Sequence, residues 1–580
     1  MIIVDKSEAV LAEKFRDAAV IAACEQCGCC SSACPLTGKN DFNIRRIIRH
    51  VQLDFVNEMA DSPLPWFCTT CGRCEEACPY SVEILAGIRA LRQLSPSERV
   101  PEWPPCTLAC PAGVDVPGYL RLIAQGKVDD AYALILEKVP FPGVLGRVCT
   151  HPCEDACRRE AVNMPIAICA LKRYVADNAS GSWREALRVK DDTGHKVAII
   201  GAGPAGLTAA FHLRRKGHQV TVFEALPEPG GMIRFGIPDY RLPKDILRAE
   251  IKEIEDIGVE IRTNTKVDSI ERLFEEGYNA VFLAIGAHQG LRIGVEGEDS
   301  PRVIEGITFL REVSLGKGAE LGDRVAVIGG GNAAIDSART ALRLGAKEVT
   351  IIYRRTRAEM PASPEEIDEA LAEGVQIHFL AAPSRIISHD GRVELECIRM
   401  ELGAMDDSGR RRPEPIKGSE FTMSFDTIIT AIGQRPEIPH QFDLATGQGN
   451  VIQADPDTLA TSREGVFAGG DAVTGPASVI EAIAAGQRAA SSIDKFLGGD
   501  GNIEETLYER PAPEPYTGKR DKGFADLGRV EMPRVPISET HHSFTEVELG
   551  LDAEQATTEA KRCLQCDLEL VIGRPASLGD

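Results

Sequence analysis

Three features that would place a chain in a membrane, outside the cell or on nucleic acid are missing from this sequence. No apolar run reaches the ~18 residues that a membrane-spanning helix requires. The opening stretch, MIIVDKSEAVLAEKF, is amphipathic and has neither the apolar region nor the small-residue cleavage site of a secretion signal. The net charge is −22, and no Lys/Arg block is longer than a few residues. We therefore expect a cytoplasmic chain without direct membrane insertion and without nucleic acid as a partner.

Cysteine, by contrast, is abundant. The 580 residues include 18 cysteines, and this length is enough for three or four domains of ~100–200 residues each. The cytosol keeps thiols reduced, and these cysteines are grouped too tightly for a disulfide framework. Clustered cysteines in such a chain indicate bound metal.

Two segments in the first hundred residues each contain a full set of cluster ligands. CEQCGCCSSACP begins at Cys24 and CTTCGRCEEACP begins at Cys68, and both fit C-x2-C-x2-C-x3-C-P. Four thiolates at this spacing bind a 4Fe-4S cubane, and in paired motifs the fourth cysteine ligates the other cluster. Zinc is the alternative for any single CxxC, but two complete sets followed by proline disfavour it. The predicted ligand sets are Cys24, Cys27, Cys30 and Cys78 for one cluster and Cys68, Cys71, Cys74 and Cys34 for the other, with Cys29 left over.

Further along, the sequence twice repeats a strand, a glycine-rich turn and a helix. In the first repeat, KVAII precedes GAGPAG, and Glu224 ends the next strand. Glycines in this pattern permit a tight turn, a close approach to a pyrophosphate and helix packing, while the acid binds a ribose hydroxyl. The predicted dinucleotide ligands in this repeat are Gly201, Gly203, Gly206 and Glu224.

A later segment identifies the first dinucleotide. GVFAGGDA places Asp471 directly after Gly470, where a carboxylate can accept a hydrogen bond from a ribityl hydroxyl of the same cofactor. The first ligand is therefore predicted to be FAD.

The second repeat, RVAVI followed by GGGNAA, has Gly329, Gly331 and Ala334 in the fingerprint positions. Its next strand ends in Arg354 and Arg355, where an NAD site often has an acid. An arginine pair suits a 2′-phosphate. We expect NADP(H), with NAD(H) still possible because surface arginines after a strand are common.

The apolar strands DTIITAIG and GVFAGGDA return after about Thr422, which suggests that the second repeat interrupts the first. The predicted fold class is α/β, with two Rossmann-like dinucleotide-binding domains, the second inserted in the first, preceded by helical iron–sulfur domains. The flavin half contains a single cysteine, Cys397, and no redox CxxC. Disulfide reduction is therefore disfavoured, and we expect the electrons to leave through the cysteine-rich segments.

A second cysteine-rich block contains five cysteines, which do not fill two cubanes: Cys106, Cys110, Cys149, Cys153 and Cys157. From about 104 to 500 the chain contains, in this order, the motifs CTLACPAGVDVPGYL, FPGVLGRVCTHPCEDAC, GAGPAGL, GGMIRFGIPDYRLPK, GGGNAAIDSA, YRRTRAEMPA and GGDAVTGPASVIEAIAAGQ. In these motifs it resembles the small, FAD-bearing subunit of glutamate synthase and the flavin subunit of electron-bifurcating NADH-dependent ferredoxin:NADP oxidoreductases. This resemblance implies that Gly231 also binds the flavin and that the loop GIPDYRLPK shapes the flavin pocket.

The same resemblance implies where the missing cluster ligands lie. That family has an R-C-L-x-C segment before the C-x3-C-P pair, but here the segment appears at the far end of the chain, as EAKRCLQCD. We expect Cys563 and Cys566 to complete a cluster with Cys106 and Cys157, although a redox-active or zinc-binding pair is the alternative. Cys110, Cys149 and Cys153 would hold the second cluster. The family's Glu or Gln ligand matches Lys172, which cannot bind iron, so Cys169, one helical turn earlier, is the expected fourth ligand rather than a buried free thiol.

The first hundred residues resemble instead the iron–sulfur subunit of heterodisulfide reductase, especially in WFCTTCGRCEEACP. This implies an electron-transfer arm joined to the flavin module. Arg45, Arg46, Arg49 and His50 in this arm have helical spacing, which fits either a solvated face or a docking surface.

Together these patterns predict an NAD(P)H-dependent enzyme that passes electrons through FAD and four 4Fe-4S clusters to a partner, or in reverse. The partner is expected to dock at the arm and to be a molybdopterin or tungstopterin oxidoreductase. The alternatives are a bifurcating transhydrogenase subunit, a glutamate synthase small subunit and a non-catalytic electron relay. No acid or base residue is demanded by hydride transfer, and none is predicted.

The expected domains are 1–98, a two-cluster ferredoxin-like arm; 99–190, a helical cluster domain; 191–320 and 425–503, the two parts of the FAD domain; 321–424, the NAD(P)H domain; and 504–580, a C-terminal strap that returns to the cluster domain.

Overall fold

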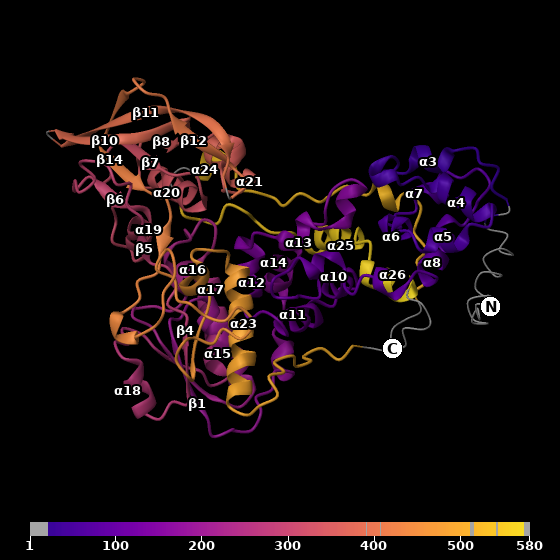
Figure 1. Ribbon diagram of the computed structural model, residues 1–580, viewed down its shortest axis with the longest axis horizontal. Helices are drawn as coiled ribbons and strands as arrows, with labels where there is room; N and C mark the ends of the chain where they lie inside the picture. Colours follow the sequence, from indigo (N-terminus) through magenta and orange to yellow (C-terminus); the bar gives the residue numbers. More distant parts are fainter. Residues whose placement is uncertain are drawn as a thin grey trace.

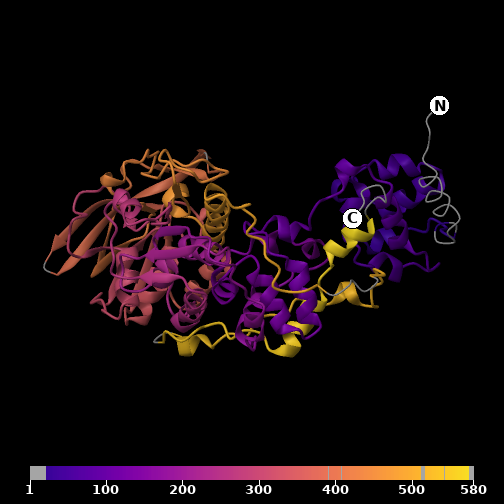
Figure 2. The ribbon, with the colours of Figure 1, turned by 90° about the horizontal axis from the view of Figure 1, so that it is seen from below.

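The computed structural model describes residues 21, 23–389, 391–406, 408–510, 516–540 and 543–573. The amphipathic opening segment lies outside the described residues. The molecule is elongated, with two nucleotide-binding domains at one end, a helical middle domain and a helical arm at the other end (Figures 1 and 2). None of the described helices is long and apolar enough to cross a membrane.

The arm consists of short helices that wrap around its cysteine loops. Its longest helices are amphipathic: α4 buries Ile44, Ile47, Ile48 and Val51 on one face, and the Asn43 side chain caps its first turn. The arm helices are α3 (Cys29–Ala33), α4 (Ile44–Gln52), α5 (Val56–Ala60), α6 (Leu64–Phe67), α7 (Arg73–Glu76) and α8 (Ile84–Gln93).

The middle domain packs its helices directly on the flavin domain. Its helices are α9 (Pro105–Leu108), α10 (Val116–Ala124), α11 (Val128–Leu136), α12 (Pro142–Val148), α13 (Pro152–Asp155) and α14 (Ile168–Asn178). One continuous apolar core includes Leu145 and Leu171 of these helices together with Leu207 and Phe282 of the flavin domain. The arm has a separate core, so the middle domain and the flavin domain form one packed unit.

The flavin domain is built on a parallel sheet with the strand order β16-β4-β1-β2-β3. Its strands are β1 (Lys196–Ile200), β2 (Gln219–Phe223), β3 (Glu260–Arg262), β4 (Ala280–Leu283) and β16 (Val466–Ala468). The last strand comes from beyond the second nucleotide-binding domain, so that domain is inserted. Its helices are α15 (Pro204–Arg215), α16 (Gly231–Phe235), α17 (Lys244–Asp256), α18 (Ile270–Glu275), α22 (Asp471–Thr474) and α23 (Val479–Phe496).

The second sheet is also parallel, in the order β6-β14-β7-β8-β9. Its strands are β6 (Val303–Glu305), β7 (Arg324–Ile328), β8 (Glu348–Tyr353), β9 (Gln376–Phe379) and β14 (Thr427–Thr430), and its helices are α19 (Gly306–Ser314), α20 (Asn332–Arg343) and α21 (Pro364–Ala372). The fold class predicted from the sequence is confirmed.

One strand was assigned to the wrong sheet. DTIITAIG forms β14, which pairs with β7 and β6 of the second sheet and not with the flavin sheet. The second domain therefore begins before residue 321 and extends past 424. The reason is physical: a fully buried parallel strand has the same apolar pattern in either sheet, so its sequence does not identify its neighbours.

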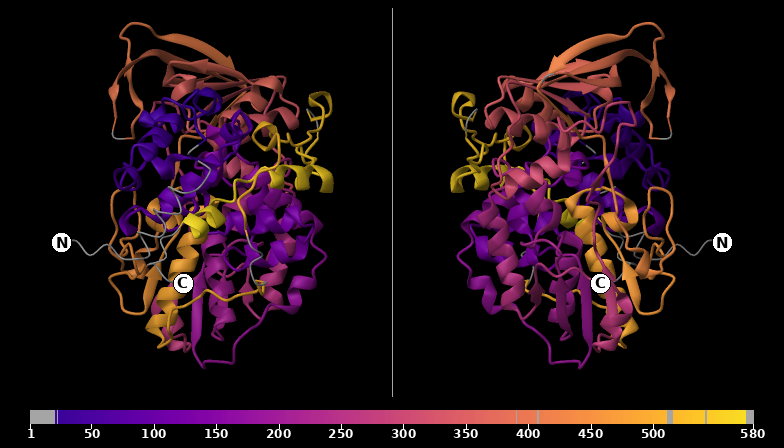
Figure 3. Two further views of the ribbon diagram at one scale, coloured as in Figure 1. Left: turned by 90° about the vertical axis from the view of Figure 1, so that its right-hand side faces the viewer. Right: turned by 90° about the vertical axis from the view of Figure 1, so that its left-hand side faces the viewer.

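An antiparallel sheet covers the outer end of the inserted domain, at the top of the views in Figure 3. It contains β10 (Ala381–His389), β11 (Arg392–Met405), β12 (Arg411–Pro415) and β13 (Phe421–Phe425), with β11 at its centre. A small ladder pairs β5 (Gln289–Gly290) with β15 (Gln434–Arg435). Single 3-10 turns occur at η1 (Lys39–Asp41), η2 (Ser97–Arg99), η3 (Arg158–Ala161), η4 (Ser182–Glu185), η5 (Arg357–Glu359), η6 (His440–Phe442) and η7 (Phe524–Asp526).

The C-terminal segment returns along the whole molecule. It passes the inserted domain at α24 (Ile537–Thr540), crosses the middle domain with α25 (Ala553–Lys561) and reaches the arm at α26 (Cys566–Gly573) (Figure 1). Arg89 on α8 pairs with Glu569 on α26 at 2.7 Å. The two ends of the described chain therefore meet at the arm.

Candidate flavin cavity and cysteine sites

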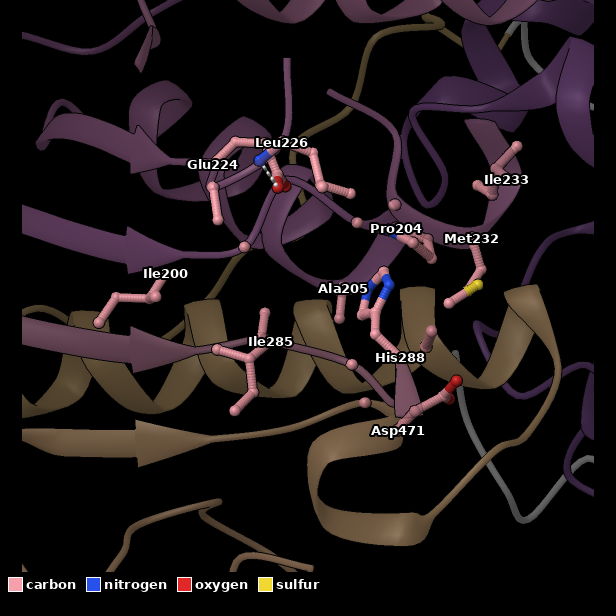
Figure 4. Close-up of a pocket in the computed structure, with 18 of the residues that line it drawn as sticks. Ile200, Pro204, Ala205, Glu224, Leu226, Met232, Ile233, Ile285, His288 and Asp471 are labelled. Carbon is pink, nitrogen blue, oxygen red and sulfur yellow. Dashed lines mark hydrogen bonds between the residues drawn. The ribbon is translucent and has the colours of Figure 1, made fainter. Parts of the chain in front are cut away.

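A cavity of about 380 Å³ opens at the carboxyl ends of β1, β2, β4 and β16. This edge of a parallel sheet is where nucleotide ligands bind in such folds. Glu224 and Leu226 lie at one end of the cavity, and Met232, His288 and Asp471 lie at the other (Figure 4). Its predicted lining residues Gly201, Gly203, Glu224, Gly231, Gly470 and Asp471 are all brought together there.

Glycine is required at two points of the first fingerprint. Gly201 has φ +106°, and a Cβ there would lie 2.4 Å from the Ala284 carbonyl oxygen. A Cβ at Gly206 would lie 2.0 Å from the Gly201 carbonyl oxygen. Larger residues would push α15 away from the sheet, and the helix N-terminus would no longer face the cavity as an anion site.

Glu224 is fixed by the turn that it closes. Its carboxylate accepts from the Ala202 amide at 2.9 Å and from the Leu226 amide at 2.8 Å. Burial raises its pKa, while the backbone amides oppose that shift. Each carboxylate oxygen keeps a second lone pair for a ribose hydroxyl.

Asp471 lies at the opposite end of the cavity, as the first residue of α22. Burial raises its pKa to about 6, and the Ala477 amide partly offsets this shift. A buried carboxylate with this pKa needs a polar ligand group to favour its ionised form.

Sequence reasoning missed two further groups in this cavity. His288 and Arg311 also line it, and burial, followed by the nearby Arg311 charge, lowers the pKa of His288 to about 4. No local motif marks either residue. The N-terminus of α23 also faces the cavity. The sequence does mark this helix start, because Ser478 and Glu481 have the spacing of a capping box.

In the inserted domain, Gly329 has φ +145°, and a Cβ there would lie 2.2 Å from the Ala431 carbonyl oxygen. Gly331 precedes α20, and Ala334 is fully buried in its first turn. The two arginines after β8 differ. Arg354 is exposed, whereas Arg355 is buried and donates to Asp406 at 2.6 Å. Of these two arginines, only Arg354 is exposed to solvent.

The loop GIPDYRLPK contacts both nucleotide-binding domains. Ile237 lines the flavin cavity, but Arg241 donates to Asp336 at 2.7 Å and also to Glu366 in the inserted domain. The Arg343 guanidinium lies 3.8 Å from the centre of the Tyr240 ring. The loop therefore sets the position of the inserted domain as well as the shape of the cavity.

The sixteen predicted cluster cysteines lie in four groups. We call them the inner site (Cys110, Cys149, Cys153, Cys169), the C-terminal site (Cys106, Cys157, Cys563, Cys566), the boundary site (Cys34, Cys68, Cys71, Cys74) and the outer site (Cys24, Cys27, Cys30, Cys78).

The outer site is the most accessible of the four. Its cysteines line one small cavity together with Arg45 and Tyr80, and Cys27 is exposed. The boundary site is nearly buried: Cys68, Cys71 and Cys74 are buried, and burial raises the pKa of Cys34 to about 11. Cys34 interacts electrostatically with Cys68 and Cys71, so the fourth cysteine of the first motif does reach the second motif.

The C-terminal site joins the two most distant parts of the sequence. Cys106 and Cys157 line a cavity with Cys563 and Cys566. Burial raises the pKa of Cys106 well above its usual value, and the neighbouring Cys563 and Cys566 thiols add to the shift.

The inner site lies where the middle domain contacts the flavin domain. Gln487 on α23 donates to the Ala112 carbonyl at 3.4 Å, close to Cys110 in the sequence. Cys169 interacts with Cys149 and Cys153, and its Sγ donates to the Leu145 carbonyl at 3.2 Å. Lys172 is 3 % exposed and interacts with all four of these thiols.

Three of the sites share one local turn. The backbone amides of Thr70, His151 and Gln565 each donate at 3.4 Å to the Sγ of the cysteine two residues earlier, which is Cys68, Cys149 or Cys563. Thr70, His151 and Gln565 each have positive φ. The turn directs backbone N–H groups at sulfur, which is the contact that tunes iron–sulfur clusters.

Each of the four groups contains four thiols, the number of ligands that one 4Fe-4S cubane requires. Within the described ranges, no group of three or more His, Cys, Asp or Glu side chains is placed to hold a single metal ion. A tetrahedral zinc would need four sulfurs about 2.3 Å from one point, whereas each thiolate of a cubane binds its own iron. Burial raises the pKa of most of these thiols, so metal binding would release protons.

Residues 195–486 match the pyridine nucleotide-disulphide oxidoreductase family. The chain belongs to this family. Residues 100–183 match the 4Fe-4S domain II of dihydropyrimidine dehydrogenase, and residues 20–82 match the 4Fe-4S dicluster domain. These matches, together with the NADP-dependent relatives described below, confirm the predicted flavin, NADP and iron–sulfur cofactors and the oxidoreductase class, whereas the number of clusters stays a prediction. The only cysteine of the flavin half, Cys397, is buried in β11, so the family name implies no disulphide chemistry here.

Several characterised proteins resemble the chain over most of its length. The NADP(+)-dependent formate dehydrogenase subunit beta of Moorella thermoacetica is 44 % identical over 497 residues, which are 80 % of this chain and 70 % of that protein. The NADPH-Fe(3+) oxidoreductase subunit beta of Geobacter sulfurreducens is 40 % identical over 515 residues, 80 % of this chain and 75 % of that protein. The glutamate synthase [NADPH] small chain of Escherichia coli is 36 % identical over 419 residues, 68 % of this chain and 89 % of that protein, which confirms the resemblance noted from the motifs.

Among solved structures, FprA of Mycobacterium tuberculosis in complex with NADPH aligns with 52 % of this chain and 84 % of its own, at 22 % identity and a TM-score of 0.44.

Proposed function

We propose that this chain is the NADPH-oxidising subunit of a larger oxidoreductase and that it delivers electrons through four 4Fe-4S clusters to a catalytic partner. The observation that carries the proposal is the order of the sites. The inner site adjoins the flavin domain, the C-terminal and boundary sites adjoin each other, and the outer site lies in the arm.

The flavin end supports a hydride-accepting role. When bound, FAD accepts a hydride from NADPH as two electrons and releases them one at a time to clusters that each carry one electron. Glu224 and Asp471 bind the two ends of the cofactor, and the N-termini of α15 and α23 face its polar groups. In the inserted domain, Gly329, Gly331 and Ala334 approach the NADPH pyrophosphate, while Arg354 binds the 2′-phosphate.

The arm supports a docking role for its outer end. Arg45, Arg46 and Arg49 on α4 are exposed, and no described carboxylate pairs with them. Arg45 also lines the outer site. In a protein of net charge −22, such a basic face favours a partner with an acidic rim around its electron acceptor.

The relatives support the kind of partner. Two of them are named as β subunits, of a formate dehydrogenase and of an NADPH-Fe(3+) oxidoreductase. We propose a partner of the same kind, in which a molybdopterin or tungstopterin cofactor exchanges the electrons.

Anaerobic stopped-flow mixing with NADPH tests the hydride step. We expect the flavin absorbance to bleach first and the cluster absorbance to fall afterwards. A flavin that stays oxidised would overturn the enzyme assignment and leave only a passive relay.

Docking has a separate test. Replacement of Arg45, Arg46 and Arg49 by Gln should weaken binding of the co-purified partner roughly tenfold at low salt and should remove much of its salt dependence. The matched control replaces three exposed arginines of the nucleotide-binding half, Arg262, Arg272 and Arg292. Equal losses in both variants would contradict docking at the arm.

A further inference from the structure

The arm meets the rest of the molecule, which we call the body, at a junction between two cysteine sites. Cys71 of the boundary site packs against Leu564, and Cys566 of the C-terminal site lies at the edge of the same cluster, which also contains Val162, Phe524 and Ala525. An electron that passes between the C-terminal site and the boundary site would cross this junction. Such a transfer oxidises one site as it reduces the other by a single electron and needs no proton or co-reactant.

Arg158 connects the two sites directly. It follows Cys157 of the C-terminal site in the sequence, and its Nη2 donates to three carbonyls of the arm: Cys68 at 2.7 Å, Trp66 at 2.8 Å and Phe67 at 2.9 Å. No described carboxylate pairs with Arg158. Its charge therefore stays uncompensated except by carbonyl dipoles and the cysteines.

Arg520 makes a second connection of the same kind. Its Nε donates to the Thr70 carbonyl at 3.1 Å, in the loop between Cys68 and Cys71. Its Nη2 donates to the Leu564 carbonyl at 2.6 Å, in the loop between Cys563 and Cys566. One side chain of the C-terminal segment thus bridges the ligand loops of both sites.

The charges at this junction act on both sites. Arg92, which is 1 % exposed, donates to the same Cys68 carbonyl at 2.6 Å. Arg158 and Arg92 therefore both bind the backbone of the boundary-site ligand loop at Cys68. A cation between two sites stabilises an added electron on either of them.

We propose that Arg158 and Arg520 are positioning residues for electron transfer between the C-terminal and boundary sites. They hold the two ligand loops together across the domain boundary. Arg158 also places positive charge between the loops, whereas Arg520 is paired with Glu569 at 3.4 Å. The inference rests on the proposed function, because it requires that both sites hold clusters. The rate of electron transfer falls with the distance between the two sites, so an opening of this junction would slow the transfer.

The test compares Arg158→Met and Arg520→Met with a matched control, Arg89→Met. Arg89 also joins arm and body, through Glu569 at 2.7 Å and the Gly518 carbonyl at 2.8 Å, but it touches no ligand loop. In the double variant Arg158→Met/Arg520→Met, we expect reduction of the arm clusters by NADPH to slow at least about tenfold, while flavin bleaching keeps its rate. We also expect the reduction potential of the boundary site to become more negative by ~59 mV, which is a tenfold change in the equilibrium constant of a one-electron couple.

Three readouts separate the outcomes. Iron content shows whether each variant still holds its clusters, EPR-monitored redox titration reports the potential of the boundary site, and spin coupling between reduced clusters reports their separation. Arg158→Lys keeps the positive charge, so the reduction potential of the boundary site in this variant should equal that of the unmodified protein. Unchanged potentials and coupling at full iron content would overturn the inference and leave the proposed function intact. If the unmodified protein holds only the iron of the arm, about eight atoms, the proposed function itself fails first.

Discussion

The two halves of this molecule are assembled by different rules. In the nucleotide-binding half, each site is formed by a continuous strand, turn and helix, and the sheet brings the remaining residues to the same edge. In the cysteine-rich half, the C-terminal site brings Cys106 and Cys157 together with Cys563 and Cys566. A dinucleotide site can thus form with its own domain, whereas this cysteine site exists only after the chain has returned along the whole molecule.

The largest expected effect is removal of the returning ligands. The double variant Cys563→Ser/Cys566→Ser should lose about four of the sixteen irons expected for four cubanes and keep its FAD. The arm should then no longer be reduced by NADPH, because the connection to the body is missing. Iron, sulfide and flavin quantitation measures this, with Cys29→Ser as the control, since Cys29 belongs to none of the four groups. Full iron content in the double variant would contradict the assignment of Cys563 and Cys566 as cluster ligands.

Cys169 offers a sharper version of the same comparison. Cys169→Ser should lose up to four irons from the inner site and uncouple the flavin from all clusters. Cys397→Ser is the control, since Cys397 is a buried cysteine that lies in β11 of the inserted domain and belongs to none of the four groups. The same iron content and EPR spectrum in both variants would mean that Cys169 is a structural thiol.

In the nucleotide-binding half, we expect a local effect of one side chain. Arg354→Ala should raise the dissociation constant for NADPH roughly 10- to 100-fold, the value of a charge-assisted contact to phosphate, and leave NADH nearly unchanged. Arg357→Ala is the control, because Arg357 is exposed nearby but is paired with Asp368 at 2.6 Å. A loss of NADPH affinity in the Arg357 variant alone would place the phosphate elsewhere.

The smallest expected effect is a pH dependence of FAD binding. Burial raises the pKa of Asp471 to about 6, and a ribityl hydroxyl donates to the ionised carboxylate. FAD affinity of the apoprotein should therefore fall as the pH drops through about 6, by roughly tenfold between pH ~7.5 and pH ~5. Fluorescence titration of FAD measures the affinity, and Asp471→Asn should flatten the profile. An unchanged profile in that variant would exclude Asp471 as the titrating group.

The difference between the halves also explains what the sequence could predict. The dinucleotide fingerprints around Gly201 and Gly329 could be predicted because their glycines lie within one continuous strand, turn and helix. The exchange of Cys34 and Cys78 between the arm sites followed from the spacing of the motifs alone. Cys563 and Cys566 could be grouped with Cys106 and Cys157 only through the resemblance of their motif to one that stands elsewhere in a related family.

Other features had no sequence signal. The strand at Thr427–Thr430 was assigned to the flavin sheet because buried parallel strands look alike. Arg355 was paired with Arg354 as a phosphate ligand, but burial and the ion pair with Asp406 hold it in the antiparallel sheet. Arg158 and Arg520 were overlooked because their partners are backbone carbonyls, which the identity of the residue does not report.

The proposed function requires an ordered path of four clusters that NADPH reduces through FAD. Anaerobic titration of the purified chain with NADPH, followed by EPR and combined with iron and FAD quantitation, tests this path. We expect about sixteen irons per FAD and successive reduction of four distinct clusters. About eight irons per FAD, with reduction confined to the arm, would contradict it.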